Sequence, residues 1–374
     1  MNIIVVGDVV EGKRTTANSL AEGFATLGGH EVVGYPEASV DTWRDLADPG
    51  HLDGVDLIVW SRSRTLWRRY DMHAMLAAAR QAGTGTVAFH LDRWWGLSRE
   101  AEVAEDPFFR CDLVVTTDGG NPDRWEAAGV NHEWLPPAVA DADAALTGRH
   151  HAAAAGKAVF VGSWQAYAHP QWRHRGALVK RLKRRFGPRL VTFPDQTGRR
   201  VTGQELADIL ASAAVVVGDS ALVGGTGRYW SDRVPITLGM GGALVHPVVD
   251  GMDEQGLVAG VHFLGAPVGD IDALGDVVAS VLAGADTTEV RAAGRAAVLA
   301  GHTFETRAQQ IIDLYGEFRA RQGYPVSEPA PAPPAPSSSP SSSSSRQTPG
   351  ARSKDSSKSG RSALAALTGD VFQP

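Results

Sequence analysis

This sequence has little cysteine, no long apolar run and no excess of positive charge. Its 374 residues include one cysteine, Cys111, so an intrachain disulfide is impossible and a reducing cytoplasm is expected. No stretch approaches the ~20 apolar residues of a membrane-spanning helix, and we expect no membrane partner. The formal net charge of −6 gives the whole chain no basic field for nucleic acid. Cysteine and histidine spacings typical of zinc sites are also lacking, and we expect no bound metal.

Length and composition predict two domains and a tail. A chain of 374 residues is too long for one ordinary core, and its apolar opening at residues 2–6 is interpreted as a strand, not a signal peptide. We place an N-terminal domain at residues 1–137, a linker at 138–156, a C-terminal domain at 157–324 and a tail at 325–374. The tail, rich in proline and serine, cannot bury enough apolar surface to fold and is predicted to be disordered.

Apolar runs of strand length alternate with helical apolar patterns in both domains, which predicts α/β folds with parallel, doubly wound sheets. The expected strands are residues 2–6, 30–35, 56–61, 85–90, 112–117, 132–135, 157–161, 190–193, 214–217, 243–245 and 261–264. The expected helices are residues 15–27, 64–81, 176–186, 203–212, 270–282 and 288–299, followed by a last helix that Thr303 caps and that ends at residue 322.

The segment after residues 215–217 has the pattern of an anion site. A glycine-rich loop follows this β-branched run, and Ser231 and Asp232 then stand where a short helix should begin, between Arg228 and Arg233. A helix N-terminus at the carboxyl edge of a parallel sheet is a place where α/β proteins bind phosphates. The alternative is that the glycines form only a turn and that Ser231 and Asp232 are an ordinary N-cap, worth roughly 1 kcal/mol.

The run YWSDRVPITLGMGGALVHP at residues 229–247 resembles the spore-coat-type, group 1-like glycosyltransferases of the GT-B fold, a family with bacteriophage members. FVGS at residues 160–163, Arg175 and an HT…R pattern that ends at Arg307 match the same family. The resemblance implies two Rossmann-like domains that face each other across a cleft. It also implies metal-independent sugar transfer from a nucleotide-sugar, with no resident cofactor.

The resemblance also implies a donor site in the C-terminal domain. Its candidate residues are Gly162, Ser163, Arg175, Arg228, Tyr229, Ser231, Asp232, Arg233, Gly241 and Gly242. Members of the family carry a ribose-binding glutamate where this chain has Ile236, which cannot accept hydrogen bonds. Asp232, four residues earlier on the same helical face, is our candidate substitute.

His90 and Asp92 are the candidate catalytic residues on the acceptor side. They stand at the carboxyl end of the expected strand 85–90, where two residues at this spacing point to one side. They could act as an acid–base pair, with Trp94 and Trp95 as platforms for a sugar or base. Alternatively, His90 and Asp92 satisfy loop backbone groups and the two tryptophans pack.

The loop from Gly7 through Gly12 and Lys13 to Thr15 nearly spells a P-loop. Arg14 separates Lys13 from Thr15, so the hydroxyl would point about 100° away from the position that binds magnesium. We therefore favour a glycine-rich loop that lines the cleft. An ATP-dependent phosphotransferase that uses this loop remains an alternative, as does a GT-B-like binding protein without catalysis.

The sequence does not identify the acceptor of the sugar. A virion protein, a modified DNA base and a host polymer are the candidates. If the chain is encoded by a phage, the expected cytoplasm is that of the host. The DxD spelling at Asp141 and Asp143 lies in the expected linker, where no rigid strand end would present it to a metal.

Overall fold

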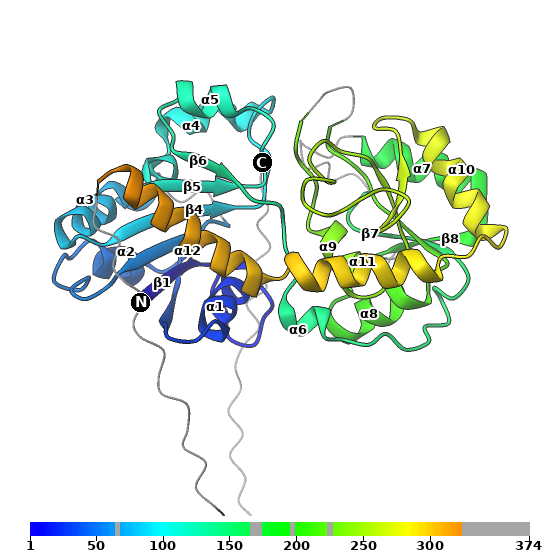
Figure 1. Cartoon of the computed structure of the whole chain (residues 1–374), viewed down its shortest axis with the longest axis horizontal. Helices are drawn as coiled ribbons and strands as arrows, with labels where there is room; N and C mark the ends of the chain where they lie inside the picture. The colour runs from blue at the N-terminus through cyan, green and yellow to red at the C-terminus, as the bar shows by residue number, and fades with distance from the viewer. Residues whose placement is uncertain (64–67, 165–173, 195–198, 223–226, 324–374) are drawn as a thin grey trace, which may run out of the picture. The chain divides into compact units, whose positions relative to one another are not determined.

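The computed structural model describes residues 1–63, 68–164, 174–194, 199–222 and 227–323. These residues contain two parallel β-sheets, one of six strands and one of five (Figure 1). The expected doubly wound α/β fold with two such sheets is therefore confirmed. No described helix is long and apolar enough to cross a membrane. The predicted tail lies outside the described residues.

The N-terminal sheet has the strand order β2-β1-β3-β4-β5-β6, and every neighbouring pair is parallel. Its strands are β1 (Asn2–Gly7), β2 (Glu31–Pro36), β3 (Leu57–Ser61), β4 (Gly85–His90), β5 (Leu113–Thr116) and β6 (His132–Trp134). The helices among them are α1 (Thr16–Thr26), α2 (Val40–Leu46), α3 (Met72–Ala82), α4 (Glu102–Glu105) and α5 (Pro122–Ala127), with 3-10 turns at Ser98–Ala101 and Pro107–Arg110.

Alternating side chains of the N-terminal strands build two separate cores. On β1, Ile4 and Val6 join the core under α2 and α3, while Ile3 and Val5 join the core under α1. Successive residues of a strand point to opposite faces of the sheet, so both faces must be covered by helices. This explains why these strands are continuous apolar runs.

The C-terminal sheet has the strand order β11-β10-β9-β7-β8 and is also parallel. Its strands are β7 (Ala158–Val161), β8 (Leu190–Phe193), β9 (Val215–Val217), β10 (Leu244–Pro247) and β11 (Leu264–Ala266). Its helices are α7 (Arg175–Phe186), α8 (Gly203–Ser212), α9 (Arg233–Gly239), α10 (Ile271–Leu282) and α11 (Thr288–Gly301), with a 3-10 turn at Gly187–Arg189.

Helices cover both faces of the C-terminal sheet as well. Ala158 and Phe160 of β7 pack with apolar residues of α7 and α10, whereas Val159 between them packs with residues of α8. The alternation again follows the two-residue period of a strand. The carboxyl edge of each sheet is thereby left to loops, which is where α/β proteins place their binding sites.

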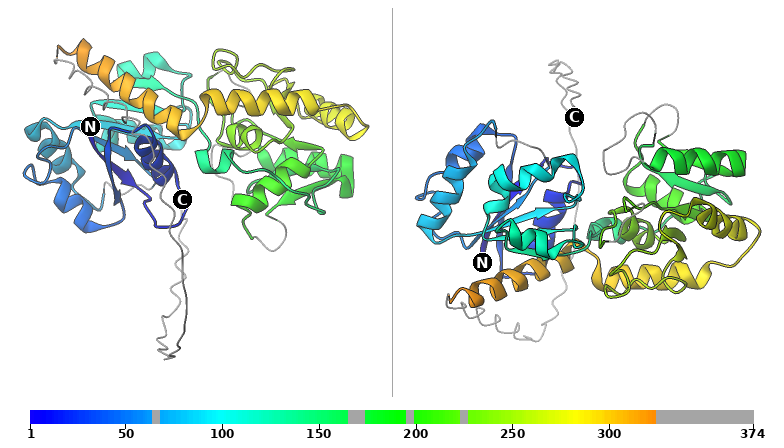
Figure 2. Two further views of the ribbon diagram at one scale, coloured as in Figure 1. Left: turned by 60° about the horizontal axis from the view of Figure 1, so that its bottom comes forward. Right: turned by 90° about the horizontal axis from the view of Figure 1, so that it is seen from above.

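The last described helix, α12 (Phe304–Arg321), packs on the N-terminal sheet and not on the C-terminal one (Figures 1 and 2). Thr303 caps it, as predicted, by accepting a hydrogen bond from the backbone N–H of Thr306. Phe304 and Ile311 join the core that contains Ile3. The chain thus returns to its first domain, so the first strand and the last described helix share one core.

A fully buried arginine, Arg307, holds α12 to the end of the N-terminal domain. Its Nε donates to the carbonyl of Pro136 at 2.6 Å and its Nη2 to His302 Nδ1 at 3.0 Å. His302 Nε2 in turn lies 2.9 Å from the carbonyl of Gln255. Burial, with Arg307 as the second cause, lowers the pKa of His302 to about 4. This contact joins the end of the first domain, a loop of the second and α12.

Two expected element boundaries are wrong, and the linker is partly helical. The helix expected at 64–81 begins at Met72, because Asp71 caps it there by accepting from the N–H of Ala74; residues 64–67 lie outside the described chain. The strand expected at 261–264 forms only at β11, after a turn. The expected linker contains a short helix, α6 (Asp141–Ala144).

We predict that Gly23→Ala destabilises the chain through the contact between α1 and α12. A Cβ atom at Gly23 would lie 2.5 Å from the carbonyl oxygen of Phe304, and backbone cannot move aside cheaply. Such a clash costs about 1–3 kcal/mol, which exceeds the ~1 kcal/mol that alanine gains in a helix. Urea unfolding should show a lower midpoint. Gly316→Ala, on α12 with nothing within 4 Å of the added atom, should raise it; equal midpoints for both variants would contradict the packing.

We predict that His302 makes stability fall with acid. Its folded pKa of about 4 lies below the ordinary value near 6.5, so the neutral ring contributes stability above pH ~6.5 that is lost as the pH falls towards 4. The difference in unfolding free energy between wild type and His302→Gln should shrink by up to about 3 kcal/mol between pH 7 and pH 4. A difference that stays constant between pH 7 and pH 4 would refute the prediction.

Candidate functional site

Two arginines meet one buried carboxylate at the carboxyl edge of the C-terminal sheet. Asp219 follows β9, Arg175 begins α7 and Arg233 begins α9. Arg175 Nε donates to Asp219 Oδ2 at 2.7 Å, and its Nη2 lies 3.3 Å from Oδ1. Arg233 Nη1 donates to the same Oδ1 at 3.0 Å. We call these three residues the arginine cluster; two guanidiniums and one carboxylate leave it a single positive charge.

The backbone around the arginine cluster is built to admit the guanidinium of Arg233. At Gly162, directly after β7, φ is +140°, and a Cβ atom there would lie 2.7 Å from Arg233 Nη2. Glycine is therefore required both by conformation and by space. The ring of Phe160 lies 5.9 Å from the Arg175 guanidinium and 5.8 Å from that of Arg233. Burial lowers the pKa of Arg175, although Asp219 opposes this effect.

Ser163 and Ser231 also lie around this region, in different ways. The carbonyl of Ser163 accepts from Arg175 Nη1 at 3.2 Å. Ser231 is 6% exposed, and its Oγ finds no hydrogen-bond partner in the part of the chain that the structure describes. The alternative of an ordinary N-cap at Ser231 and Asp232 is not supported, because Asp232 stands before α9 with helical dihedral angles, an exposed side chain and no capping hydrogen bond. A buried hydroxyl with no hydrogen-bond partner among the described residues is unusual.

Arg228 and Tyr229 point elsewhere. Arg228 Nη2 pairs with Glu254 Oε1 at 2.6 Å, and its guanidinium lies 5.2 Å from the ring centroid of Trp134. Tyr229 is buried, and its hydroxyl donates to the carbonyl of Leu91 at 3.4 Å. Burial raises the pKa of Tyr229 well above its usual value, so the phenol keeps its proton. Neither side chain bonds to the arginine cluster in the described contacts.

Gly241 and Gly242 lie at the opposite end of α9 from the arginine cluster, between α9 and β10. Gly241 has φ of +78°, and its carbonyl accepts from Arg291 Nη1 at 3.0 Å. A Cβ atom at Gly242 would lie 2.8 Å from Thr237 Cγ2. These glycines form a tight turn into β10, and the structure does not bring them to the other candidate residues.

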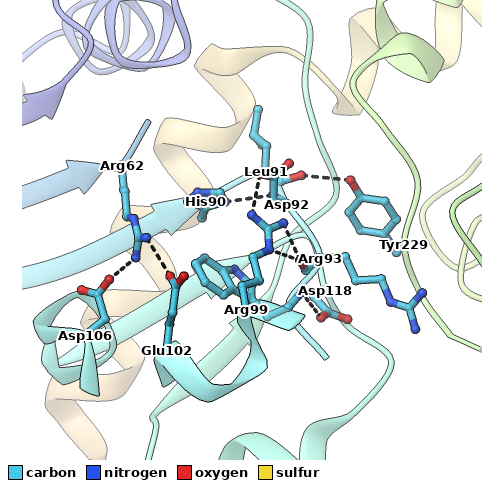
Figure 3. A network of polar contacts seen from close by, with 11 residues as sticks. Arg62, His90, Leu91, Asp92, Arg93, Arg99, Glu102, Asp106, Asp118 and Tyr229 are labelled. Carbon is cyan, nitrogen blue, oxygen red and sulfur yellow. Dashed lines mark hydrogen bonds and ion pairs between the residues drawn. The ribbon is translucent and has the colours of Figure 1, made fainter. Parts of the chain in front are cut away.

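His90 and Asp92 lie together at the end of β4 (Figure 3). The backbone N–H of Asp92 donates to His90 Nδ1 at 3.0 Å, so a neutral His90 carries its proton on Nε2. Asp92 Oδ2 pairs with Arg99 Nη1 at 3.0 Å. Asp92 lies beyond the strand, in the loop, so the two residues meet through a turn and not through the alternation of a strand.

A buried carboxylate, Asp118, fixes the backbone of this loop. Its Oδ2 accepts from the N–H of Trp94 at 2.8 Å and from that of Trp95 at 3.0 Å. Burial raises the pKa of Asp118, against the opposite effect of these two N–H groups. Trp94 and Trp95 are 0% and 6% exposed, which favours the packing role for both rings over that of platforms.

A cavity is lined by the loops after β1, β3 and β4 together with residues of the C-terminal domain. Four predicted residues lie in its wall, namely Gly12, Lys13, His90 and Asp92. Ile236, on α9, lines it from the other domain. The position where the resembling family carries glutamate therefore faces this cavity with an apolar side chain, whereas Asp232 is not among the lining residues.

The loop from Gly7 to Thr15 does not place a hydroxyl as a P-loop does. Thr15 is the N-cap of α1, and its Oγ1 accepts from the N–H of Asn18 at 3.1 Å. Asn18 Nδ2 donates to the carbonyl of Lys13 at 2.7 Å, so side chains of the loop close it on itself. A Cβ atom at Gly7 would lie 2.6 Å from Ala17 Cβ, which explains this glycine by packing.

Metal binding has no obvious place in the described residues, where no group of three or more His, Cys, Asp or Glu side chains could hold an ion. The DxD residues are used by the fold. Asp141 Oδ2 accepts from the N–H of Glu305 at 3.0 Å, and Asp143 pairs with Arg14 at 3.0 Å.

Sequence reasoning missed Asp219 and Arg99. Asp219 carried a signal, because it stands two residues after the β-branched run that became β9, at a sheet edge where polar residues gather. Arg99 carried none, because its contacts with the loop at Asp92 depend on a turn that periodicity does not show.

Comparisons with known proteins bear on the segment that holds the arginine cluster. Residues 132–313 match the sequence model of a family described as glycosyl transferase-like. No curated protein matches the sequence. The narrower resemblance to spore-coat-type enzymes and to bacteriophage members stays a prediction.

Similar solved structures include enzymes of sugar transfer. Sucrose-phosphate synthase from Thermosynechococcus elongatus has a TM-score of 0.52 at 13% identity, over 86% of this chain and 99% of that one. HepE from Anabaena in complex with UDP-glucose has 0.55 at 14%, over 85% and 100%. A glycosyltransferase from Rickettsia africae has 0.51 at 11%, over 85% and 98%. These likenesses confirm the predicted GT-B fold.

We predict that Asp219→Ala destabilises the chain by about 3–5 kcal/mol, because it leaves two guanidiniums without their shared buried carboxylate. Thermal unfolding should show the loss. Added inorganic pyrophosphate should stabilise this variant more than it stabilises wild type, since an anion can replace the carboxylate. Asp272→Ala, which breaks an exposed pair with Arg181, should cost less than about 1 kcal/mol. Similar losses of stability in both variants would contradict the role of Asp219 as a shared buried partner of the two arginines.

Proposed function

We propose that this chain is a glycosyltransferase that moves a sugar from a nucleotide-sugar donor to an unidentified acceptor, without a metal ion. The observation that carries the proposal is the arginine cluster, which lies within the segment that matches the glycosyl transferase-like family. The GT-B fold supports it, and one of the similar structures is a complex with UDP-glucose.

The arginine cluster supplies the chemistry that a nucleotide-sugar donor needs. A nucleoside diphosphate gains negative charge as it leaves the sugar, and prepositioned cations stabilise that charge. Arg233 is the more accessible arginine, with 23% of its side chain exposed against 6% for Arg175. Arg233 would therefore contact the diphosphate, while Arg175 holds Asp219. The hydroxyl of Ser231, for which no hydrogen-bond partner is found in the described part of the chain, is a further candidate donor for a phosphate oxygen. Loss of one such cation should cost about 2–4 kcal/mol of transition-state stabilisation.

The acceptor side is proposed at His90 and Asp92. Since His90 Nδ1 already accepts from the loop backbone, its Nε2–H acts as a hydrogen-bond donor to the substrate. The carboxylate of Asp92, which lines the cavity, is then the group that accepts a proton from the acceptor or orients it. Whether the sugar keeps or inverts its anomeric configuration is decided by which face the acceptor attacks.

The ribose of the donor meets a different surface from that of the resembling family. Ile236 presents an apolar side chain to the cavity, and the exposed Asp232 does not line it. We propose that donor recognition here relies on the diphosphate more than on the ribose hydroxyls. This difference also keeps the binding protein without catalysis as the rival to be tested.

We predict that at least one nucleotide-sugar raises the thermal stability of the chain. A screen of UDP-, GDP- and TDP-sugars at ~100 times Kd should add about 2.7 kcal/mol for the true donor. Arg233→Ala should remove this gain, and Arg181→Ala, which changes an arginine on the exposed face of α7, should keep it. Binding without any turnover of the donor would favour the non-catalytic rival. Stabilisation by ATP alone, lost in Lys13→Ala, would favour the phosphotransferase and overturn the proposal.

A further inference from the structure

We propose that Arg99 is a positioning residue that holds the carboxylate of Asp92 towards the acceptor. The inference rests on the proposed function, because it assigns a role within that site. It concerns a residue that touches no candidate substrate position itself and acts through Asp92.

The guanidinium of Arg99 is fixed by the loop that it serves (Figure 3). Its Nε and Nη2 both donate to the carbonyl of Arg93, at 2.8 and 2.5 Å. Its plane lies over the ring of Trp94, 4.5 Å from the centroid. These contacts leave Nη1 directed at Asp92 Oδ2, 3.0 Å away. A planar fork held in this way defines the direction of the carboxylate, which a flexible lysine could not do.

The support of Arg99 is itself rigid. Trp94 is fully buried, and its backbone N–H donates to Asp118 Oδ2. The ring also lies 5.1 Å from the guanidinium of Arg62, which pairs with Glu102 at 3.1 Å and with Asp106. A continuous set of contacts therefore runs from Asp106 through Arg62, Trp94 and Arg99 to Asp92.

The contact is unlike an ordinary surface ion pair. The side chains of Arg99 and Asp92 are 21% and 32% exposed, so both are largely withdrawn from water. Exposed pairs contribute little because their two side chains must lose freedom to meet. Here the freedom of Arg99 is already lost to Arg93 and Trp94. The pair can therefore orient Asp92 without a large further cost.

The loop that carries Asp92 also touches the donor segment. Arg93 Nη1 donates to the carbonyl of Ala221 at 3.4 Å, and the hydroxyl of Tyr229 donates to that of Leu91 at 3.4 Å. Ala221 follows Asp219 by two residues, and Tyr229 precedes Arg233 by four. The loop that carries Asp92 is thus joined by two hydrogen bonds to residues that lie close in sequence to the arginine cluster.

The test compares Arg99→Met with Arg124→Met in donor turnover. Arg124 is the matched control, because it lies 4.4 Å from the centroid of Trp95 and pairs with Glu100, but does not contact Asp92. We expect Arg99→Met to lower kcat by about 10²-fold, the effect of misplacing a reacting group by about 1 Å. The KM for the donor should change little, since the donor site is intact. Arg124→Met should keep kcat, and added guanidinium should partly restore Arg99→Met.

A double-variant cycle separates positioning from a merely structural role. If Arg99 acts through Asp92, then Arg99→Met combined with Asp92→Asn is no slower than Asp92→Asn alone. Losses that multiply, or an unchanged kcat in Arg99→Met, would overturn the inference. If Arg99→Met does not fold, Arg99→Lys serves in the same cycle, with a smaller loss expected. Wild-type chain that binds or turns over no donor would instead overturn the proposed function, and the inference with it.

Discussion

The carboxylate of Asp219 is the interaction on which the proposed donor site depends. It is buried, and it holds Arg175 and Arg233 from two different helices. Two guanidiniums placed this closely repel each other, and the carboxylate between them offsets that repulsion. Gly162 then follows as a necessity, since any side chain there would occupy the space of Arg233.

The rest of the fold brings separate segments to this edge and holds them there. Parallel strands direct the loops after β4, β7 and β9 to the carboxyl edges of their sheets. The return of α12 to the first sheet, with Arg307 buried where the domains connect, ties the two halves of the chain. On the acceptor side, a buried carboxylate has a comparable role: Asp118 accepts from backbone N–H groups of the loop that carries Asp92. Both candidate sites are thus supported by a buried aspartate.

Periodicity predicted most of the fold and part of the site. The parallel strands were found because residues buried on both faces form unbroken apolar runs. The bounds predicted for α8, residues 203–212, are the observed ones. The start of α3 was missed, because a cap at Asp71 competes with a helical pattern that begins earlier. Arg175 and Arg233 could be named from the sequence, but their pairing with Asp219 could not: Arg175 and Asp219 are 44 residues apart, and only the packing of strands decides that they meet. Arg99 was missed for another reason, because its contact with Asp92 depends on a turn that periodicity does not show.

The most direct test is the structure of the chain crystallised with a donor that stabilises it or, failing one, with UDP. The account predicts that the diphosphate lies within hydrogen-bonding distance of the Arg233 guanidinium and of Ser231 Oγ, at the carboxyl edge of the C-terminal sheet. A diphosphate bound instead on the loop from Gly12 to Thr15, with the arginine cluster unoccupied, would contradict it.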